Sequence, residues 1–235
     1  MKTITKCILL LVVLSLQKIQ AQEPERFYSS GKCAYRDKLS QQIIVNPGTY
    51  EAGSEFTDGI ALVVKDRKRG YINNTGKVVI PFEYDDASSF HDGLAAVSKG
   101  GLYGYINRKG EVIIPIKYEL CFDFTEGLAR VKSNGLYGYI RPDGAFAIDL
   151  KYSNALNFNE ELAAVCENGK WGFINTKGEF VIQPQYESAG NFSKGEARVI
   201  QNKEQFIINP NGKKLRKIES EEEREKKERK RGSKK

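Results

Sequence analysis

The sequence predicts an all-β protein built from tandem repeats of 34 residues, each a three-stranded antiparallel meander. Two observations lead to this prediction: three residue types recur with one period, and short runs of β-branched and aromatic residues alternate with turn residues. The recurring residues are Phe56, Phe90, Phe124, Phe158 and Phe192; Tyr50, Tyr84, Tyr118, Tyr152 and Tyr186; and Gly76, Gly110, Gly144, Gly178 and Gly212. A 34-residue period also occurs in helical tetratricopeptide repeats, but no window shows sustained 3.6-residue periodicity.

The strands of one repeat are clearest after Phe90. We expect them at 94–97, 103–106 and 112–114. Gly100-Gly101 and its counterparts Asn134-Gly135 and Asn168-Gly169 suit the two positive-φ positions of a type I′ hairpin. The second connection ends in the recurring glycine, which suits a three-residue hairpin with a G1 bulge.

The strands carry apolar residues on both faces, as Tyr105 and Ile106 illustrate. A small sheet with two apolar faces is not stable alone, so neighbouring meanders are expected to stack. The array is predicted to be a propeller-like ring or an open β-superhelix. A glycine also lies inside the second strand of four repeats, and we expect an aromatic ring of the adjacent repeat to pack over it. These glycines are Gly70, Gly104, Gly138 and Gly172.

The repeat domain is predicted to span residues 36–215. It contains a partial repeat at 36–50, full repeats beginning at Phe56, Phe90, Phe124 and Phe158, and a partial repeat from Phe192. The amino-terminal part supplies one strand and the last repeat two. These strands either combine to close a ring, which removes exposed sheet edges, or cap an open array.

The two ends of the chain differ in composition from the repeats. Residues 1–21 contain two early lysines, the apolar run 7–16 and Ala21, and are predicted to be a signal peptide cleaved near Ala21. A segment at 22–35 follows. Residues 216–235 form a charged basic tail, either helical or disordered. We therefore expect a secreted or periplasmic protein.

The net charge of +7 resides in these ends. Residues 213–235 carry +6 and residues 1–21 carry +3, so residues 22–212 sum to −2. A nearly neutral repeat domain does not indicate nucleic-acid binding. Contact of the tail with an anionic envelope surface is left open.

Three cysteines remain after the predicted cleavage: Cys33, Cys121 and Cys166. Cys121 stands where other repeats have alanine, so we interpret it as a small core residue. A disulfide between Cys33 and Cys166 is conceivable and depends on geometry that the sequence does not give.

The repeats resemble the WG-repeat family, whose Trp-Gly pair stands here as Trp171-Gly172 and appears as Tyr103-Gly104 and Tyr137-Gly138 in two other repeats. The resemblance covers about residues 36–215. Arg69 departs from the pattern in the first full repeat, and Gln205-Phe206 departs in the last. The resemblance implies a β-repeat module for binding or interaction, with no reaction and no catalytic residues to transfer.

Two groups of residues are candidate ligand contacts. Tyr103, Tyr137 and Trp171 occupy equivalent positions and could form an aromatic ladder, although packing between repeats also explains them. Arg67, Lys68 and Arg69 lie at one predicted hairpin tip and could bind an acidic group, although a solvated turn explains them as well.

No catalytic residue, metal ligand or cofactor is predicted. His91 takes a place that polar turn residues hold in the other repeats. Asp58, Asp92, Glu126 and Glu161 recur at the same turn and could line a rim that collects a cation, but Asp-Gly is also ordinary turn chemistry.

The sequence therefore predicts an exported, non-catalytic scaffold that binds a protein or glycan partner. A structural component of the cell envelope, anchored by the basic tail, is the alternative, and a hydrolase is a more distant one. The partner's identity and the oligomeric state are not predicted.

Overall fold

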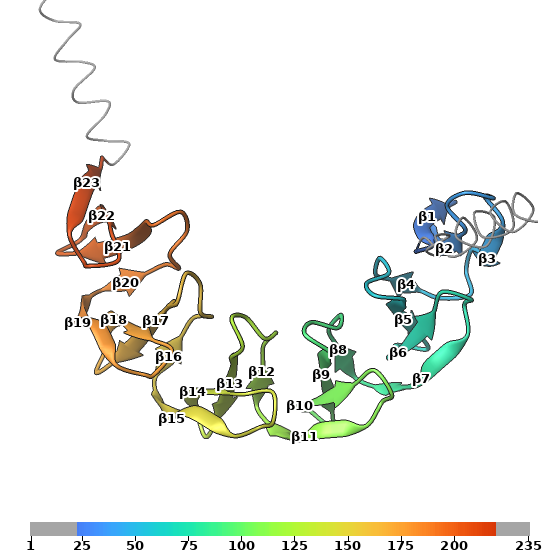
Figure 1. The fold of residues 1–235 in the computed structure, drawn as a ribbon, viewed down its shortest axis with the longest axis horizontal. Coiled ribbons are helices and arrows are strands. Elements are labelled where there is room, and N and C mark those ends of the chain that lie inside the picture. The colour runs from blue at the N-terminus through green and yellow to red at the C-terminus, as the bar shows by residue number, and fades with distance from the viewer. Residues whose placement is uncertain (1–22, 220–235) are drawn as a thin grey trace, which may run out of the picture. The chain divides into compact units, whose positions relative to one another are not determined.

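The computed structural model describes residues 23–219 and confirms the all-β repeat fold (Figure 1). The predicted signal peptide and residues 220–235 of the tail lie outside the described residues. Over residues 23–219 the protein contains no helix with the length and apolar character needed to cross a bilayer. The chain consists of two compact units.

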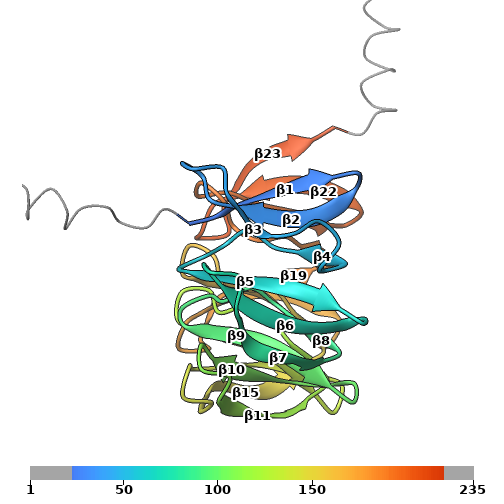
Figure 2. The same cartoon turned by 90° about the vertical axis from the view of Figure 1, so that its right-hand side faces the viewer.

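The first unit comprises the described residues up to Phe90, together with 108–110. It contains a three-stranded sheet in the order β1-β2-β3 and a four-stranded sheet in the order β4-β5-β6-β7, of which β5, β6 and β7 lie side by side in Figure 2. The strands are β1 (Glu25–Ser29), β2 (Lys32–Arg36), β3 (Ile43–Val45), β4 (Ala52–Gly53), β5 (Ile60–Lys65), β6 (Lys68–Asn73), β7 (Val78–Tyr84) and the short β8 (Asp86–Ala87).

The second unit comprises His91–Asn107 and the described residues from Glu111 onward. Its first repeat contains β9 (Leu94–Lys99), β10 (Leu102–Asn107) and β11 (Val112–Tyr118). Three four-stranded sheets follow in chain order. They are formed by β12 (Leu120–Cys121), β13 (Ala129–Ser133), β14 (Leu136–Ile140) and β15 (Phe146–Tyr152); β16 (Asn154–Ala155), β17 (Leu162–Glu167), β18 (Lys170–Asn175) and β19 (Phe180–Tyr186); and β20 (Ser188–Ala189), β21 (Ala197–Gln201), β22 (Glu204–Ile208) and β23 (Lys214–Ile218).

Each of these sheets has one more strand than the predicted meander. The extra strand is only two residues long and precedes the repeating phenylalanine, as Asn154–Ala155 precedes Phe158. Its sequence has no repeated alternation for a pattern to detect, because a two-residue strand spans only one period of the pleat.

The predicted turns are confirmed by backbone angles. The tip between β13 and β14 has positive φ at Asn134 (51°) and Gly135 (76°), as a type I′ turn requires. The second connection has its positive φ at the recurring glycine, for example 83° at Gly144.

Consecutive sheets stack within each unit, as predicted. One buried cluster combines Tyr139 and Ile148 of one sheet with Val165 and Ile174 of the next. Gly178, in a turn of the later sheet, lies against Ile148, so the glycine allows close approach as well as a positive φ. Neighbouring repeats therefore share a core.

The prediction for the second-strand glycine is wrong about what packs over it. A Cβ on Gly172 would lie 2.6 Å from the carbonyl oxygen of Ile182 and 2.8 Å from the nitrogen of Pro184, both in the third strand of the same sheet. That strand bulges, because Trp171 pairs with Tyr186 and Phe173 with Ile182. At Gly172 the bulge therefore presses backbone, not an aromatic ring, against the glycine; at Gly70 the ring of Phe82 also lies 3.0 Å from the Cβ position, but it comes from the third strand of the same sheet.

The last repeat has a side chain in place of this glycine and lacks the bulge opposite it. Phe206 stands in place of the glycine, and the ladder runs without that bulge through the pairs Gln205–Ile218, Phe206–Lys217 and Ile207–Arg216. A side chain at this position and a bulge opposite it therefore exclude each other.

Of the two alternatives for the chain ends, the structure excludes the one in which the amino-terminal strand completes the last sheet. β3 pairs with β2, which in turn pairs with β1. Strand β1 and most of β2 lie in the segment 22–35, which was expected only to precede the repeats. The last sheet contains its own third strand, β23, although 214–218 is rich in charge. Each end thus completes its sheet locally.

Candidate functional site

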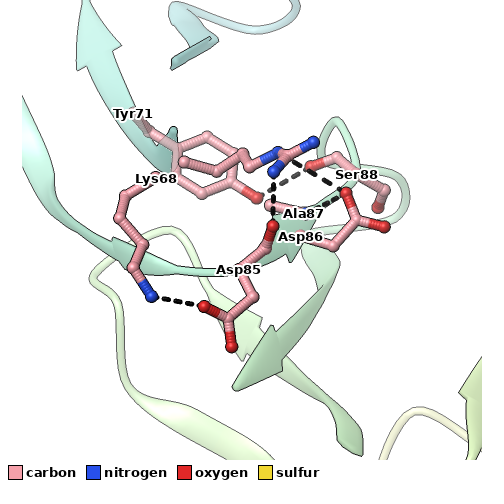
Figure 3. Close-up of polar contacts among 7 residues, drawn as sticks. Lys68, Tyr71, Asp85, Asp86, Ala87 and Ser88 are labelled. Carbon is pink, nitrogen blue, oxygen red and sulfur yellow. Dashed lines mark hydrogen bonds and ion pairs between the residues drawn. The ribbon is translucent and has the colours of Figure 1, made fainter. Parts of the chain in front are cut away.

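A tyrosine of the second strand joins each of four sheets to the chain that follows it. Tyr139 packs on Phe158 with ring centroids 4.8 Å apart, and its hydroxyl donates a hydrogen bond of 2.6 Å to the carbonyl oxygen of Leu156. Burial raises the pKa of Tyr139, so the hydroxyl stays protonated as a donor. The equivalent bonds run from Tyr35 to Ser54, from Tyr71 to Ser88, shown in Figure 3, and from Tyr105 to Phe122.

Two acidic residues of the recurring turn, Glu126 and Glu160, bind backbone amides, whereas Asp58 of the same turn accepts hydrogen bonds from the Arg108 guanidinium. The Glu126 carboxylate accepts hydrogen bonds from the backbone N–H groups of Glu160 (2.7 Å) and Glu161 (2.9 Å), one repeat later. Glu160 accepts in the same way from Lys194 and Gly195. The carboxylates therefore cap left-handed turns, and among residues 23–219 no group of three or more His, Cys, Asp or Glu side chains could hold a metal ion.

Replacing Glu126 by alanine should lower the free energy of unfolding by about 1 kcal/mol, because two amides lose a charged acceptor. Urea denaturation measures the change. Glu161→Ala is the matched control, since it removes a carboxylate from the same kind of turn without removing either of these bonds, and it should stay within about 0.5 kcal/mol of the parent. Equal losses in the two variants would contradict the capping role.

The predicted aromatic residues Tyr103, Tyr137 and Trp171 lie on the second strands of three different sheets and are each half-buried. Trp171 packs against a buried cluster, which favours its structural interpretation. Tyr137 differs, because Arg130 and Lys132 each place a cation 5.5 Å from the centre of its ring. Tyr137 also packs against a buried cluster, so it combines core contacts with two neighbouring cations.

The predicted basic residues lie at and beside the tip between β5 and β6. Lys68 pairs with Asp85, and Arg69 donates to the carbonyl oxygen of Asp85 while its Nε lies 3.6 Å from the Asp86 carboxylate. Figure 3 shows Lys68 reaching the carboxylate of Asp85. Arg67 is exposed at the tip. Two of the three predicted contact residues thus have acidic partners within the first unit.

His91 is 52% exposed in its side chain, and its Nε2 lies 3.7 Å from the Asp123 carboxylate. Its backbone closes the recurring turn with Leu94. His91 therefore lies at a solvent-facing turn, where the pattern of polar residues predicted it.

Cys33, Cys121 and Cys166 are all free thiols. Cys121 is half-buried and packs against a hydrophobic cluster, in agreement with its interpretation as a core residue. Burial raises the pKa of Cys121 from its ordinary value of 9.0 to about 12, outweighing a hydrogen bond with Tyr105 that lowers it.

This shift predicts slow alkylation of Cys121. A raised pKa leaves less thiolate at a given pH, so at pH 8 almost all of the Cys121 thiol is protonated in the folded chain. Iodoacetamide should therefore label Cys121 in the folded chain far more slowly than in denaturant, as peptide mapping by mass spectrometry would show. Similar rates in both states would contradict the burial of this thiol.

Arg130, Lys132 and Phe122 were not predicted from the sequence. Arg130 and Lys132 lie beside Tyr137, and Phe122 lies against Arg130. The Arg130 guanidinium lies 3.6 Å from the centre of the Phe122 ring. The register of Arg130 holds Ala96 and Ala164 in the neighbouring repeats but arginine again at Arg26 and Arg198, so the repeat alignment alone does not single out Arg130. An arginine in place of a small core residue requires a local reason that a periodic pattern does not supply.

The third strands leave apolar side chains exposed at equivalent positions. In the second unit these are Val112 (52%), Ile113 (41%), Phe146 (39%) and Val181 (46%). The same strands bury Ile114, Ile148 and Ile182, so the core is formed without the exposed residues. Exposed apolar side chains that recur on the same strand of successive repeats are candidates for contact with a partner.

The WG containing repeat matches four consecutive segments of the chain, at residues 70–103, 103–137, 137–171 and 171–204. Together these segments cover more than half of the sequence. No curated protein matches the chain.

Solved structures show distant likeness. A eukaryotic initiation factor is 12% identical, with 85% of this chain and 63% of that chain covered and a TM-score of 0.52. Hsv2p of Kluyveromyces lactis is 12% identical, with 80% and 75% covered and a TM-score of 0.47. Apo AztD of Citrobacter koseri is 14% identical, with 85% and 72% covered and a TM-score of 0.47. At such identities the likeness concerns the fold alone.

Proposed function

This chain belongs to the WG containing repeat family, and from that premise we propose that it is an exported, non-catalytic scaffold that binds a protein partner. The observation that carries the proposal is the series of exposed apolar side chains on the third strands, at Val112, Ile113, Phe146 and Val181. Burial of such residues against a partner is favourable, and the shared core keeps the strands that bear them rigid.

Capture from the cell envelope and the medium tests this function. The protein spanning residues 22–235, with and without the double substitution Ile113→Ser and Val181→Ser, would be used as bait after cross-linking. We expect one protein to be recovered with the parent and lost with the double variant. Gln183→Ala is the control, because Gln183 is exposed on the same strand as Val181 and its carbonyl, not its side chain, accepts a hydrogen bond.

Recovery of a glycan in place of a protein would overturn the choice of partner. Envelope association that disappears when residues 220–235 are deleted, with no partner captured, would favour the anchored structural component. The deletion must begin after Ile218, because β23 belongs to the last sheet. Export is tested separately by sequencing the amino terminus of the mature protein, which should begin near Gln22.

A further inference from the structure

Arg130 of β13 holds a positive charge in a confined place. Its guanidinium lies 3.6 Å from the centre of the Phe122 ring and 5.5 Å from that of Tyr137. Nη1 donates to the carbonyl oxygen of Ala155, whereas Nε is enclosed and has no hydrogen-bond partner. Burial lowers the pKa of Arg130, which shows that its surroundings disfavour the charge.

Arg26 occupies the same register in the first repeat and serves as an internal comparison. Arg26 lies opposite Tyr35 across the strand pair, as Arg130 lies opposite Tyr139. Its Nη1 donates to the carbonyl oxygen of Gly53 at 2.6 Å, the counterpart of the bond to Ala155. The two arginines therefore make the same structural bond.

The two sites differ in how the charge is balanced. The Nε of Arg26 lies 3.0 Å from the carboxylate of Glu55. Asn157 occupies the position equivalent to Glu55, three repeats later. Asn157 is neutral, and its Oδ1 is enclosed without a hydrogen-bond partner. Within residues 23–219 Arg130 forms no ion pair, so the described chain does not supply the carboxylate that Arg26 has.

Lys132 adds a second cation beside the same ring. Its Nζ lies 5.5 Å from the centre of the Tyr137 ring and 3.7 Å from the carboxylate of Glu119. The neighbourhood also contains apolar surface, since Phe122 and Tyr137 are half-buried and Leu136 is 38% exposed. A ligand that fits must offer a negative charge next to apolar groups.

We propose that Arg130 binds an aspartate or glutamate side chain from an acidic, apolar segment of the protein partner. The proposal rests on the function proposed above and names the chemistry of its ligand. Because Nε is enclosed and Nη1 bonds to Ala155, a ligand carboxylate would accept from Nη2 of Arg130. The rings of Phe122 and Tyr137 limit the movement of the guanidinium before binding. An acidic peptide is favoured over an acidic glycan because apolar side chains flank the cations.

The probe is a fluorescent decapeptide in which glutamate alternates with leucine, measured by anisotropy with the protein spanning residues 22–235. A peptide with glutamine in place of glutamate tests the need for charge, and an oligogalacturonate tests the glycan. We expect the glutamate peptide to bind at least tenfold more tightly than the other two, and Arg130→Gln to remove that preference. Arg198→Gln, an exposed arginine in the same register, should leave it unchanged.

A second variant keeps the test valid if Arg130→Gln fails to fold. Asn157→Asp changes one amide to a carboxylate of the same size, and it gives Arg130 the internal partner that Arg26 has in Glu55. We expect this variant to melt at a higher temperature and to bind the glutamate peptide at least tenfold more weakly. An unchanged affinity in Asn157→Asp would overturn the proposal, as would equal binding of the glutamate and glutamine peptides.

The outcomes separate this inference from the proposed function. If the double variant at Ile113 and Val181 loses its captured partner while Arg130→Gln keeps it at full affinity, the scaffold function stands and the carboxylate site is wrong. Tighter binding of oligogalacturonate than of the glutamate peptide would overturn the choice of a peptide ligand.

Discussion

Replacing Gly104 by alanine should destabilise the protein by about 3 kcal/mol or more. A methyl group on Gly104 would lie 2.5 Å from the carbonyl oxygen of Ile114 and 2.8 Å from the Cα of Ile116. Both contacts are with backbone, so no side-chain rotation relieves them, and the third strand has to move. The loss would be measured as a lower urea midpoint in equilibrium denaturation.

Gly190→Ala is the matched control. The nearest atom to a methyl group there is the carbonyl oxygen of Arg198, at 3.7 Å, and the φ of Gly190 is not positive. This variant should remain within about 0.5 kcal/mol of the parent. A similarly small effect of Gly104→Ala would show that the third strand gives way easily and that the bulge does not require the glycine.

Replacing Tyr139 by alanine should cost about 4 kcal/mol. The ring is fully buried between two sheets, packs on Phe158 and carries the hydroxyl that bonds to Leu156. Its removal leaves a cavity in a shared core and an unsatisfied carbonyl. Urea denaturation followed by tryptophan fluorescence measures the change, because Trp171 belongs to the adjoining sheet.

Tyr139→Phe separates the two contributions. It keeps the ring and removes only the hydroxyl, and should cost about 1.5 kcal/mol. Phe173, which packs on Phe192 with centroids 4.8 Å apart, shows that the fold accepts a phenylalanine in this register. If Tyr139→Phe were as damaging as Tyr139→Ala, the hydrogen bond rather than packing would dominate the junction.

Much of the fold follows from local pattern in the sequence. Strands and turns repeat with one period, so the apolar faces, the Asn134-Gly135 tip and the turn glycine Gly144 could all be placed in advance. The features that could not be predicted from the sequence are those that depend on pairing between strands of a sheet. The bulge opposite Gly172 is set by strand register, and the closure of each end by β3 and β23 depends on pairing partners that no motif identifies.

The candidate site was predicted less well than the fold, for a related reason. Tyr137 was found because its position recurs, whereas Arg130 was missed because the same register also holds Arg26 and Arg198, and what sets it apart is the loss of a partner carboxylate. Its unbalanced charge is visible only beside Arg26, whose partner Glu55 has the neutral counterpart Asn157. Residues that recur in every repeat reveal the fold, whereas a candidate binding residue is recognised by how its surroundings differ from those of its counterparts in other repeats.

The carboxylate caps have a consequence for how such a protein grows in evolution. Glu126 binds amides 34 and 35 residues later, and Glu160 does the same for the next turn, so both junctions use identical chemistry. An in-frame tandem duplication of residues 126–159 would therefore create a new junction that the existing residues already satisfy. Gain or loss of whole repeats by unequal recombination would thus alter the length of the protein while keeping this carboxylate–amide contact at each junction between repeats.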